Sequence, residues 1–239
     1  MAIAWQPFQR RRLEIAPEQL LRLMGYRDAA TIRPQVRETA AAMAQLAESA
    51  ATPAASYRRV PIASCSAQEL VLSTGTRFGG SALHDLLSDC EAVVVFVLSL
   101  GARFDGVQRN LAAGGKTLEA YMMEMAGWIA IEQATRLLRQ HLQAEAKGEA
   151  LRLTRRMAPG YTTRADGIKV EWPLEDQRPL FKLFGEDAPA RLVEGSCAMT
   201  PKMSRSGLFG LAPAAATRAA PAQTPCPRNI TRNPGEMAR

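Results

Sequence analysis

The chain has 239 residues, 47% hydrophobic and 22% charged, and this ordinary globular usage excludes a fully disordered or fibrous protein. Its net charge of +7 suggests an acidic partner. Residues 211–239 alone hold four arginines and one acid, however, and no basic stripe is interleaved with aromatics, so the distribution of charge argues against nucleic-acid binding.

Four scattered cysteines without a CxxC pair favour a reducing, cytoplasmic setting. The N-terminus has no apolar signal region, and the longest apolar run, 92–100, is about half a membrane span.

The first predicted part, residues 1–52, is helical. Pro17 suits the first turn of a helix, Gly25-Tyr26 interrupts it, and a second helix is predicted over about 32–50 before the ATPAAS linker. We expect this segment to pack against the main domain.

The next segments introduce strands. Residues 56–63 and 67–72 are short enough to be strands or connections, and periodicity does not separate the two. Ser81 is a predicted N-cap of a short helix. The run EAVVVFVLSLG, ended by Gly101, is typical of a strand buried on both faces.

The second half continues this mixture. A helix over 103–113 should close at Gly114-Gly115, and Thr117 should cap a longer helix to about residue 146. Another helix is predicted near 173–184. The stretches ARLVEGSCAM and MSRSGLFGL predict an antiparallel pair around TPK. The fold class is therefore α+β: a helical N-terminal segment, then a mixed helix and antiparallel-sheet domain over 53–211, and a disordered basic tail over 212–239.

Few side chains carry an obvious chemical signal. GGKT at 114–117 lacks the earlier glycine of a phosphate-binding loop, because Asn110 stands there. His84 and His141 have no further ligand at metal-binding spacing. Glu132 is different, because apolar neighbours surround it on its predicted helix and a carboxylate there requires a cation, hydrogen-bond donors or exposure to solvent.

The segment RRMAPGYTT predicts an exposed turn that carries a guanidinium and an aromatic ring a few residues apart. Arginine can hold a carboxylate with two hydrogen bonds, and tyrosine offers a ring face and a hydroxyl. A simple turn with a nearby surface arginine explains the same residues equally well.

Taken together, four segments resemble the activation (reactivation) domain of vitamin B12-dependent methionine synthase and its free-standing relatives. The similarity runs in order from about Leu13 to Leu211, with Arg-x-Ala-Pro-Gly-Tyr as its most specific signature. Gly195 is inserted in the last segment, and no histidine follows the Pro-Gly-Tyr turn as it does in full-length methionine synthases. The segments are GWIAIEQA at 127–134, RMAPGY at 156–161, WPLEDQRPLFKLF at 172–184 and VEGSCAMTPKMSRSGLFG at 193–210.

The resemblance implies binding of S-adenosylmethionine and help in the reductive methylation of a cobalamin that a partner carries. By family position, Arg156 would hold the methionyl carboxylate, Glu132 the α-ammonium and the Ala158 backbone the adenine, while Tyr161 would lie between donor and corrin. The implied partners are the cobalamin-binding domain of methionine synthase or another corrinoid protein, and a flavodoxin- or ferredoxin-type electron donor. The cobalt would carry the chemistry, so the resemblance implies no catalytic side chain in this chain.

Two other functions remain open at this stage. The chain could be a non-catalytic module that binds a corrinoid protein or S-adenosylmethionine. It could also be a basic nucleic-acid adaptor, an interpretation that rests mainly on the tail.

Overall fold

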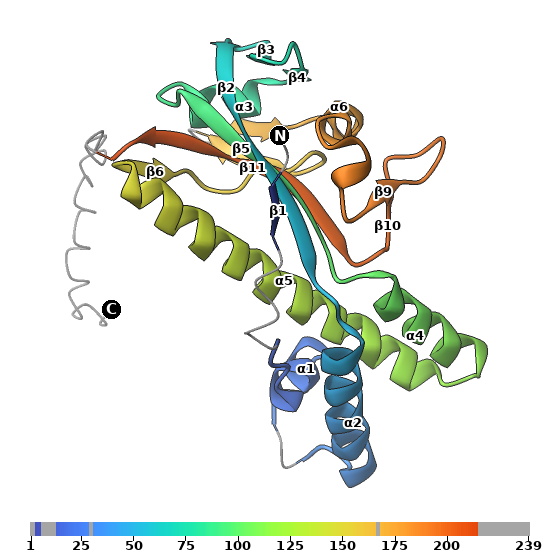
Figure 1. Cartoon of the computed structure of the whole chain (residues 1–239). Coiled ribbons are helices and arrows are strands. Elements are labelled where there is room, and N and C mark those ends of the chain that lie inside the picture. The colour runs from blue at the N-terminus through green and yellow to red at the C-terminus, as the bar shows by residue number, and fades with distance from the viewer. Residues whose placement is uncertain (1–2, 6–12, 29–30, 166–167, 215–239) are drawn as a thin grey trace, which may run out of the picture.

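The computed structural model describes residues 3–5, 13–28, 31–165 and 168–214. Its centre is a seven-stranded antiparallel sheet in the order β4-β3-β2-β5-β11-β6, with β1 paired to β2 (Figure 1). The central strand β5 is paired along its whole length, with Ala54–Pro61 of β2 on one edge and with Ser204–Leu211 of β11 on the other. The strands are β1 Ile3–Trp5, β2 Ala54–Cys65, β3 Glu69–Leu72, β4 Arg77–Gly79, β5 Ala92–Ser99, β6 Leu151–Leu153 and β11 Ser204–Pro213.

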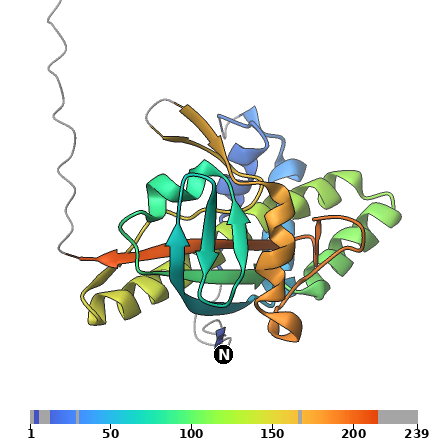
Figure 2. The same ribbon diagram turned by 90° about the horizontal axis from the view of Figure 1, so that it is seen from above.

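Helices cover the two faces of the sheet unequally. One face carries α1 (Pro17–Leu23), α2 (Pro34–Ala50), α4 (Ala102–Ala113) and the long α5 (Thr117–Gly148). The other carries α3 (Ser81–Leu87) and α6 (Gln177–Lys182). Seen from above, α6 lies in front of β5 and β11, and α5 passes behind them (Figure 2).

Short elements complete the chain between α5 and β11. The strands β7 (Thr162–Ala165) and β8 (Ile168–Glu171) form a hairpin, and a 3-10 turn, Leu174–Asp176, leads into α6. After a second 3-10 turn, Gly185–Asp187, the two-residue strands β9 (Arg191–Leu192) and β10 (Met199–Thr200) form another hairpin.

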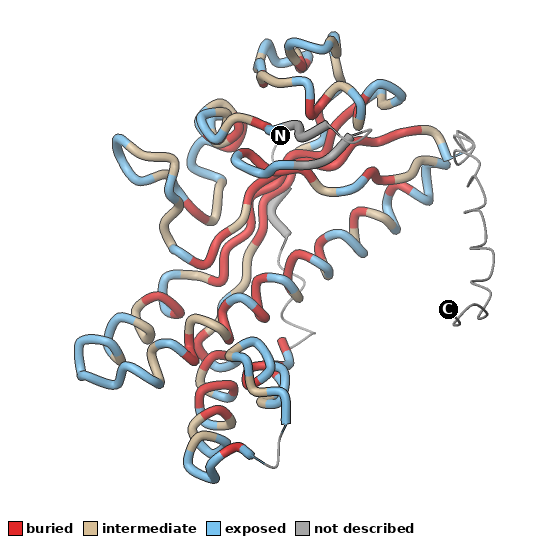
Figure 3. The backbone as a smooth tube through the Cα atoms, turned by 180° about the vertical axis from the view of Figure 1, so that it is seen from behind, coloured by how far each residue is buried: buried red, intermediate tan, exposed pale blue. Residues whose placement is uncertain are grey.

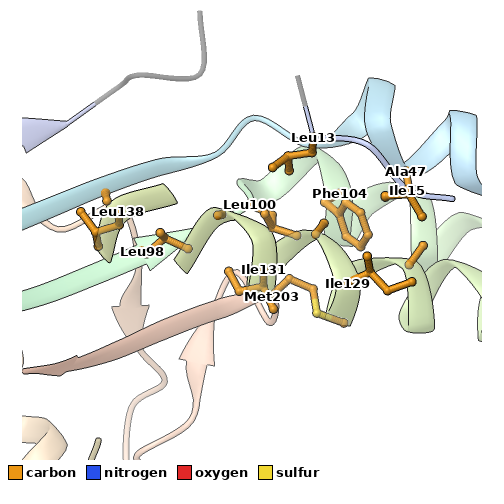
Figure 4. Close-up of a cluster of buried hydrophobic side chains, with 14 of the residues drawn as sticks. Leu13, Ile15, Ala47, Leu98, Leu100, Phe104, Ile129, Ile131, Leu138 and Met203 are labelled. Carbon is orange, nitrogen blue, oxygen red and sulfur yellow. The ribbon is translucent and has the colours of Figure 1, made fainter. Parts of the chain in front are cut away.

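Strand β5 separates two hydrophobic cores. All eight of its residues are buried, as the unbroken apolar run predicts (Figure 3). Because successive side chains of a strand point to opposite faces, they alternate between the two cores. Phe96 and Leu98 belong to the core under α1, α2, α4 and α5, while Val95 and Val97 belong to the core under α3 and α6. Figure 4 shows the first core where α5 passes over β5, including Leu98, Ile131 and Met203.

The predicted α+β class is confirmed. The helices begin and end close to the predicted residues. Of the two segments that could be strands or connections, 56–63 lies within β2, and 67–72 is a strand from Glu69 onward. Ser81 and Thr117, predicted as N-caps, are instead the first helical residues, and neither helix has a side-chain cap. The strand β1 was not predicted.

The predicted antiparallel pair around TPK is wrong. ARLVEGSCAM folds on itself as the β9-β10 hairpin, and MSRSGLFGL becomes β11 between β5 and β6. The physical reason is burial. An apolar strand such as β11, buried along nearly its whole length, needs an apolar partner of similar length, which β5 supplies and the half-exposed Arg191–Leu192 does not.

Within the described part of the chain, no helix is both long and apolar enough to cross a bilayer. Helices α1 and α2 share the core under α5 with the sheet. Most of the predicted tail, residues 215–239, lies outside the described residues.

A close backbone approach joins β11 to the segment that follows β6. The Met157 N–H donates to the Leu208 carbonyl at 3.0 Å, and the Leu208 N–H donates to the Met157 carbonyl at 2.9 Å. Gly207 permits this approach, because a Cβ there would lie 2.3 Å from the Met157 carbonyl oxygen. Its φ of 156° is also one that L side chains rarely adopt.

We expect Gly207→Ala to destabilise the fold by about 3 kcal/mol, because the new methyl group would collide with the Met157 carbonyl. Gly106→Ala is the matched control. Gly106 lies inside α4 with open space around its missing Cβ, so alanine there should stabilise the fold by roughly 0.5–1 kcal/mol. Urea denaturation measures both. Equal stability of the two variants would contradict this account of the junction.

Candidate functional site

The Arg156–Tyr161 segment forms a tight turn that is held from two sides. The Tyr161 N–H donates to the Ala158 carbonyl at 3.1 Å, and Gly160 has a φ of 79°. A proline followed by a glycine with positive φ is the pattern of a type II turn. On one side the Met157 bridge ties the turn to β11, and on the other the Gly160 N–H donates to the Trp172 carbonyl at 2.8 Å.

Trp172 anchors the second side. Its side chain is fully buried and makes an edge-to-face contact with Phe78 at a centroid distance of 5.4 Å. Its Nε1–H donates to Asp176 Oδ2 at 2.8 Å, and the Gly79 N–H donates to the same oxygen at 2.7 Å. Burial raises the pKa of Asp176 above its usual value, although these two hydrogen bonds act to lower it. The turn is thus attached to both β11 and the β4 end of the molecule.

The turn borders a pocket of about 140 Å³ beside β11. Among the described residues this part of β11 has no strand partner on its outer edge, since β6 pairs only with Leu211–Pro213 and Met157 bridges only Leu208. Because the backbone of a strand alternates, Ser206 presents its N–H and C=O to the same edge as Leu208. The pocket is lined by Trp128, Ile131, Arg156, Ala158, Pro159, Tyr161, Gln177, Met199, Lys202, Met203, Ser204, Arg205 and Ser206.

Three of the four predicted site residues line this pocket: Arg156, Ala158 and Tyr161. The turn is less exposed than predicted, since Met157 and Ala158 are buried and Arg156 is half-buried, because the bridge to β11 draws the segment onto the sheet. The Arg156 guanidinium carbon lies 5.2 Å from the centroid of the Tyr161 ring. Its Nη1 is buried and has no hydrogen-bond partner among the described residues.

The fourth residue, Glu132, stands on α5 at the margin of the pocket. Its side chain is 56% exposed and accepts a hydrogen bond of 2.5 Å from Arg205 Nη1, and Arg205 does line the pocket. Burial by itself raises the pKa of Glu132. The hydrogen bond and charge of Arg205, followed by the charges of Arg156 and Arg136, outweigh burial and lower the pKa below its usual value.

Sequence reasoning missed Arg205, although a signal for it was present. Arg205 is the only charged residue in β11, and a single arginine in a buried strand needs a partner near the sheet. Trp128 was missed as well. It lies one helical turn before Glu132 and lines the pocket with half of its surface exposed. Gln177 was also missed; it is buried and its Oε1 accepts a hydrogen bond from Ser206 Oγ at 3.2 Å.

The pocket is electropositive. Its charged lining residues are Arg156, Lys202 and Arg205, and no carboxylate lines it among the described residues. Lys202 is neutralised by Glu124, to which its Nζ donates at 2.7 Å. The two arginines therefore dominate the local field and favour an anionic group. No cluster of three metal-ligating side chains occurs in the described part of the chain.

We expect the pKa of Glu132 to rise in Arg205→Ala, less in Arg156→Ala and least in Arg136→Ala, in the order of their influence. Because the folded-state pKa lies below the unfolded value, ionised Glu132 stabilises the fold above that unfolded value. This contribution is lost as the pH falls through the lowered pKa. NMR titration of the Glu132 carboxyl carbon measures the shifts, and an unchanged pKa in Arg205→Ala would show that the pair does not form in solution.

Comparison with known proteins adds one finding about the fold. No family model matches the chain, and no curated protein matches it in sequence. A solved structure described as the crystal structure of the MetH reactivation domain bound to AdoHcy matches with a TM-score of 0.57 and 14% sequence identity. The match covers 88% of this chain and 78% of that chain. This chain therefore has a fold similar to that of a MetH reactivation domain.

Proposed function

We propose that this chain binds S-adenosylmethionine in the pocket beside β11 and supports reductive methylation of a corrinoid held by a partner protein. The observation that carries the proposal is Arg156: among the residues that the structure describes, its buried Nη1 has no hydrogen-bond partner and no carboxylate lines the pocket. The shared fold supports it, because the neighbouring MetH reactivation domain was crystallised with AdoHcy.

Arg156 fits the carboxylate of the methionyl group. A buried guanidinium N–H without a partner is costly, and a carboxylate is the group that accepts two parallel hydrogen bonds from a guanidinium. The guanidinium lies over the Tyr161 ring, and this cation–π contact restricts the arginine before any ligand arrives. A fixed donor loses less conformational entropy on binding than a mobile one.

Glu132 is suited to the α-ammonium. Only its Oε2 is used by Arg205, and more than half of the side chain is exposed at the margin of the pocket. Its lowered pKa keeps the group ionised at neutral pH. When the ligand carboxylate bonds Arg156, the ligand ammonium beside it would lie against the negative charge of Glu132.

The nucleoside would lie along the turn. The Ala158 carbonyl accepts the Tyr161 N–H and retains a second lone pair for an adenine amino group. Trp128 and Tyr161 are each about half exposed, so two aromatic faces are available at the mouth of the pocket.

The size of the pocket bears on the partner. A volume of about 140 Å³ is well below the roughly 300–1,000 Å³ typical of small-molecule sites, so it encloses only part of a nucleoside ligand. We propose that the corrinoid protein covers the remainder, with the sulfonium facing the cobalt. A flavodoxin- or ferredoxin-type donor would supply the one electron that reduces the corrinoid. The methyl group would then pass from the sulfonium sulfur to the reduced corrinoid, and breaking the sulfur–carbon bond would leave S-adenosylhomocysteine as a neutral thioether.

We expect Arg156→Ala to weaken S-adenosylmethionine binding by tenfold or more, because loss of a charge-assisted pair costs about 1.5–3 kcal/mol. The control is Arg155→Ala, since Arg155 is exposed and does not line the pocket. Isothermal titration calorimetry measures both, with a micromolar or weaker dissociation constant expected for the unmodified chain. Equal losses in the two variants would show that the turn is merely basic.

The decisive test of function is methylation of a corrinoid protein under reducing conditions. We expect methylcobalamin to form faster with the chain than without it, and Arg156→Ala to remove most of the acceleration. Binding of S-adenosylmethionine without any acceleration would instead support the alternative, a non-catalytic module. A chain that does not bind the donor at millimolar concentration, with or without a corrinoid protein, would refute the proposed function and the non-catalytic S-adenosylmethionine-binding module, and would leave only a module that binds a corrinoid protein.

A further inference from the structure

Arg205 occupies an unusual position for a charged side chain. It pairs with Leu98 of β5 and shares the α5 side of the sheet with Gly207 and Phe209. Its side chain is only 12% exposed, whereas the Glu132 carboxylate that it contacts is 56% exposed. The cation is therefore much more desolvated than its anionic partner, and a single exposed carboxylate compensates a buried charge only in part.

The hydrogen bonds of Arg205 leave part of its guanidinium available. Nη1 donates to Glu132 Oε2 at 2.5 Å and to Thr135 Oγ1 at 3.4 Å. Both contacts use the same nitrogen, and no hydrogen bond within the described residues uses Nε or Nη2. A guanidinium carries five N–H donors in a rigid fork, so Arg205 has unused donors while its position is fixed by α5.

The pocket brings Arg205 and Arg156 together. Both line it, and the only other cation in the lining, Lys202, is paired with Glu124. Two guanidinium groups at one small cavity repel each other unless an anion lies between or beside them. Glu132 supplies one negative charge at the margin, and the cavity itself has room for another.

We propose that Arg205 is a specificity-determining residue that binds the same ligand carboxylate as Arg156, while Glu132 both positions Arg205 and accepts the ligand ammonium. This rests on the proposed binding of S-adenosylmethionine. The consequence is that the pocket recognises the amino-acid end of the ligand first. It discriminates against nucleosides that lack a free carboxylate.

Two neutral thioether ligands separate this role from general binding. S-adenosylhomocysteine carries the amino-acid group, and 5′-methylthioadenosine has the same nucleoside and thioether without it. We expect the unmodified chain to prefer S-adenosylhomocysteine by at least tenfold in calorimetry. Arg205→Ala should weaken the binding of S-adenosylhomocysteine by tenfold or more and leave the affinity for 5′-methylthioadenosine within twofold of the unmodified chain.

Further variants test the mechanism of this preference. Arg205→Lys should recover part of the preference, because it keeps the charge without the fork, and it also serves if Arg205→Ala does not fold. Glu132→Gln should weaken the binding of S-adenosylhomocysteine and leave the binding of 5′-methylthioadenosine unchanged. Arg155→Ala should change neither of these two affinities. Circular dichroism and the melting temperature establish that each variant is folded.

The outcomes distinguish the two proposals. If Arg205→Ala weakens the binding of both ligands equally, Arg205 only ties α5 to β11 and this inference is wrong. The proposed binding of the nucleoside is not contradicted by that result. An unchanged affinity of Arg205→Ala for S-adenosylhomocysteine overturns it as well. If the unmodified chain binds neither ligand, the proposed function itself is wrong and the inference falls with it.

Discussion

The backbone junction between Met157 and Leu208 is the constraint on which the candidate site depends. Two reciprocal hydrogen bonds join an irregular segment to a buried strand, and they form only because Gly207 has no Cβ in the space that the Met157 carbonyl occupies. The junction fixes Arg156, the residue before it, against the sheet. It is also the last pairing on that edge of β11 within the described part of the chain, so Ser206 has no strand partner there. The same contact thus positions the guanidinium and creates the opening beside it.

The electrostatics of the pocket follow from which elements meet there. Strand β11 brings Arg205, the turn brings Arg156, and α5 brings Glu132 to the margin. Two half-buried or buried cations face one exposed anion, and this imbalance gives the cavity an affinity for a further negative group. A zwitterion satisfies the whole arrangement, because its carboxylate meets the arginines while its ammonium meets Glu132. That complementarity links the proposed ligand to the charges of the site.

The hydrophobic architecture explains why the pocket is at an edge. Strand β5 is buried on both faces, with a hydrophobic core packed on either side of it. The margin between α5 and the Arg156–Tyr161 turn is where both layers end, so side chains from each face of the sheet reach the same cavity. Trp128 and Tyr161 remain exposed there, and an interacting protein would cover them at the cost of little ordering.

The sequence by itself determined the secondary structure and part of the site. The apolar run of β5 has one stable environment, a strand buried on both faces, and the proline, glycine and periodic apolar positions defined the main helices because these signals are local. Arg156 and Tyr161 were identifiable because they lie within one short turn. Tertiary structure decided which segments meet. The pairing of β11 with β5 depends on burial across about a hundred residues, so the local turn at TPK wrongly suggested a hairpin. The partnership of Glu132 with Arg205, 73 residues apart, exists only because α5 crosses the sheet above β11, and no local pattern encodes that distance.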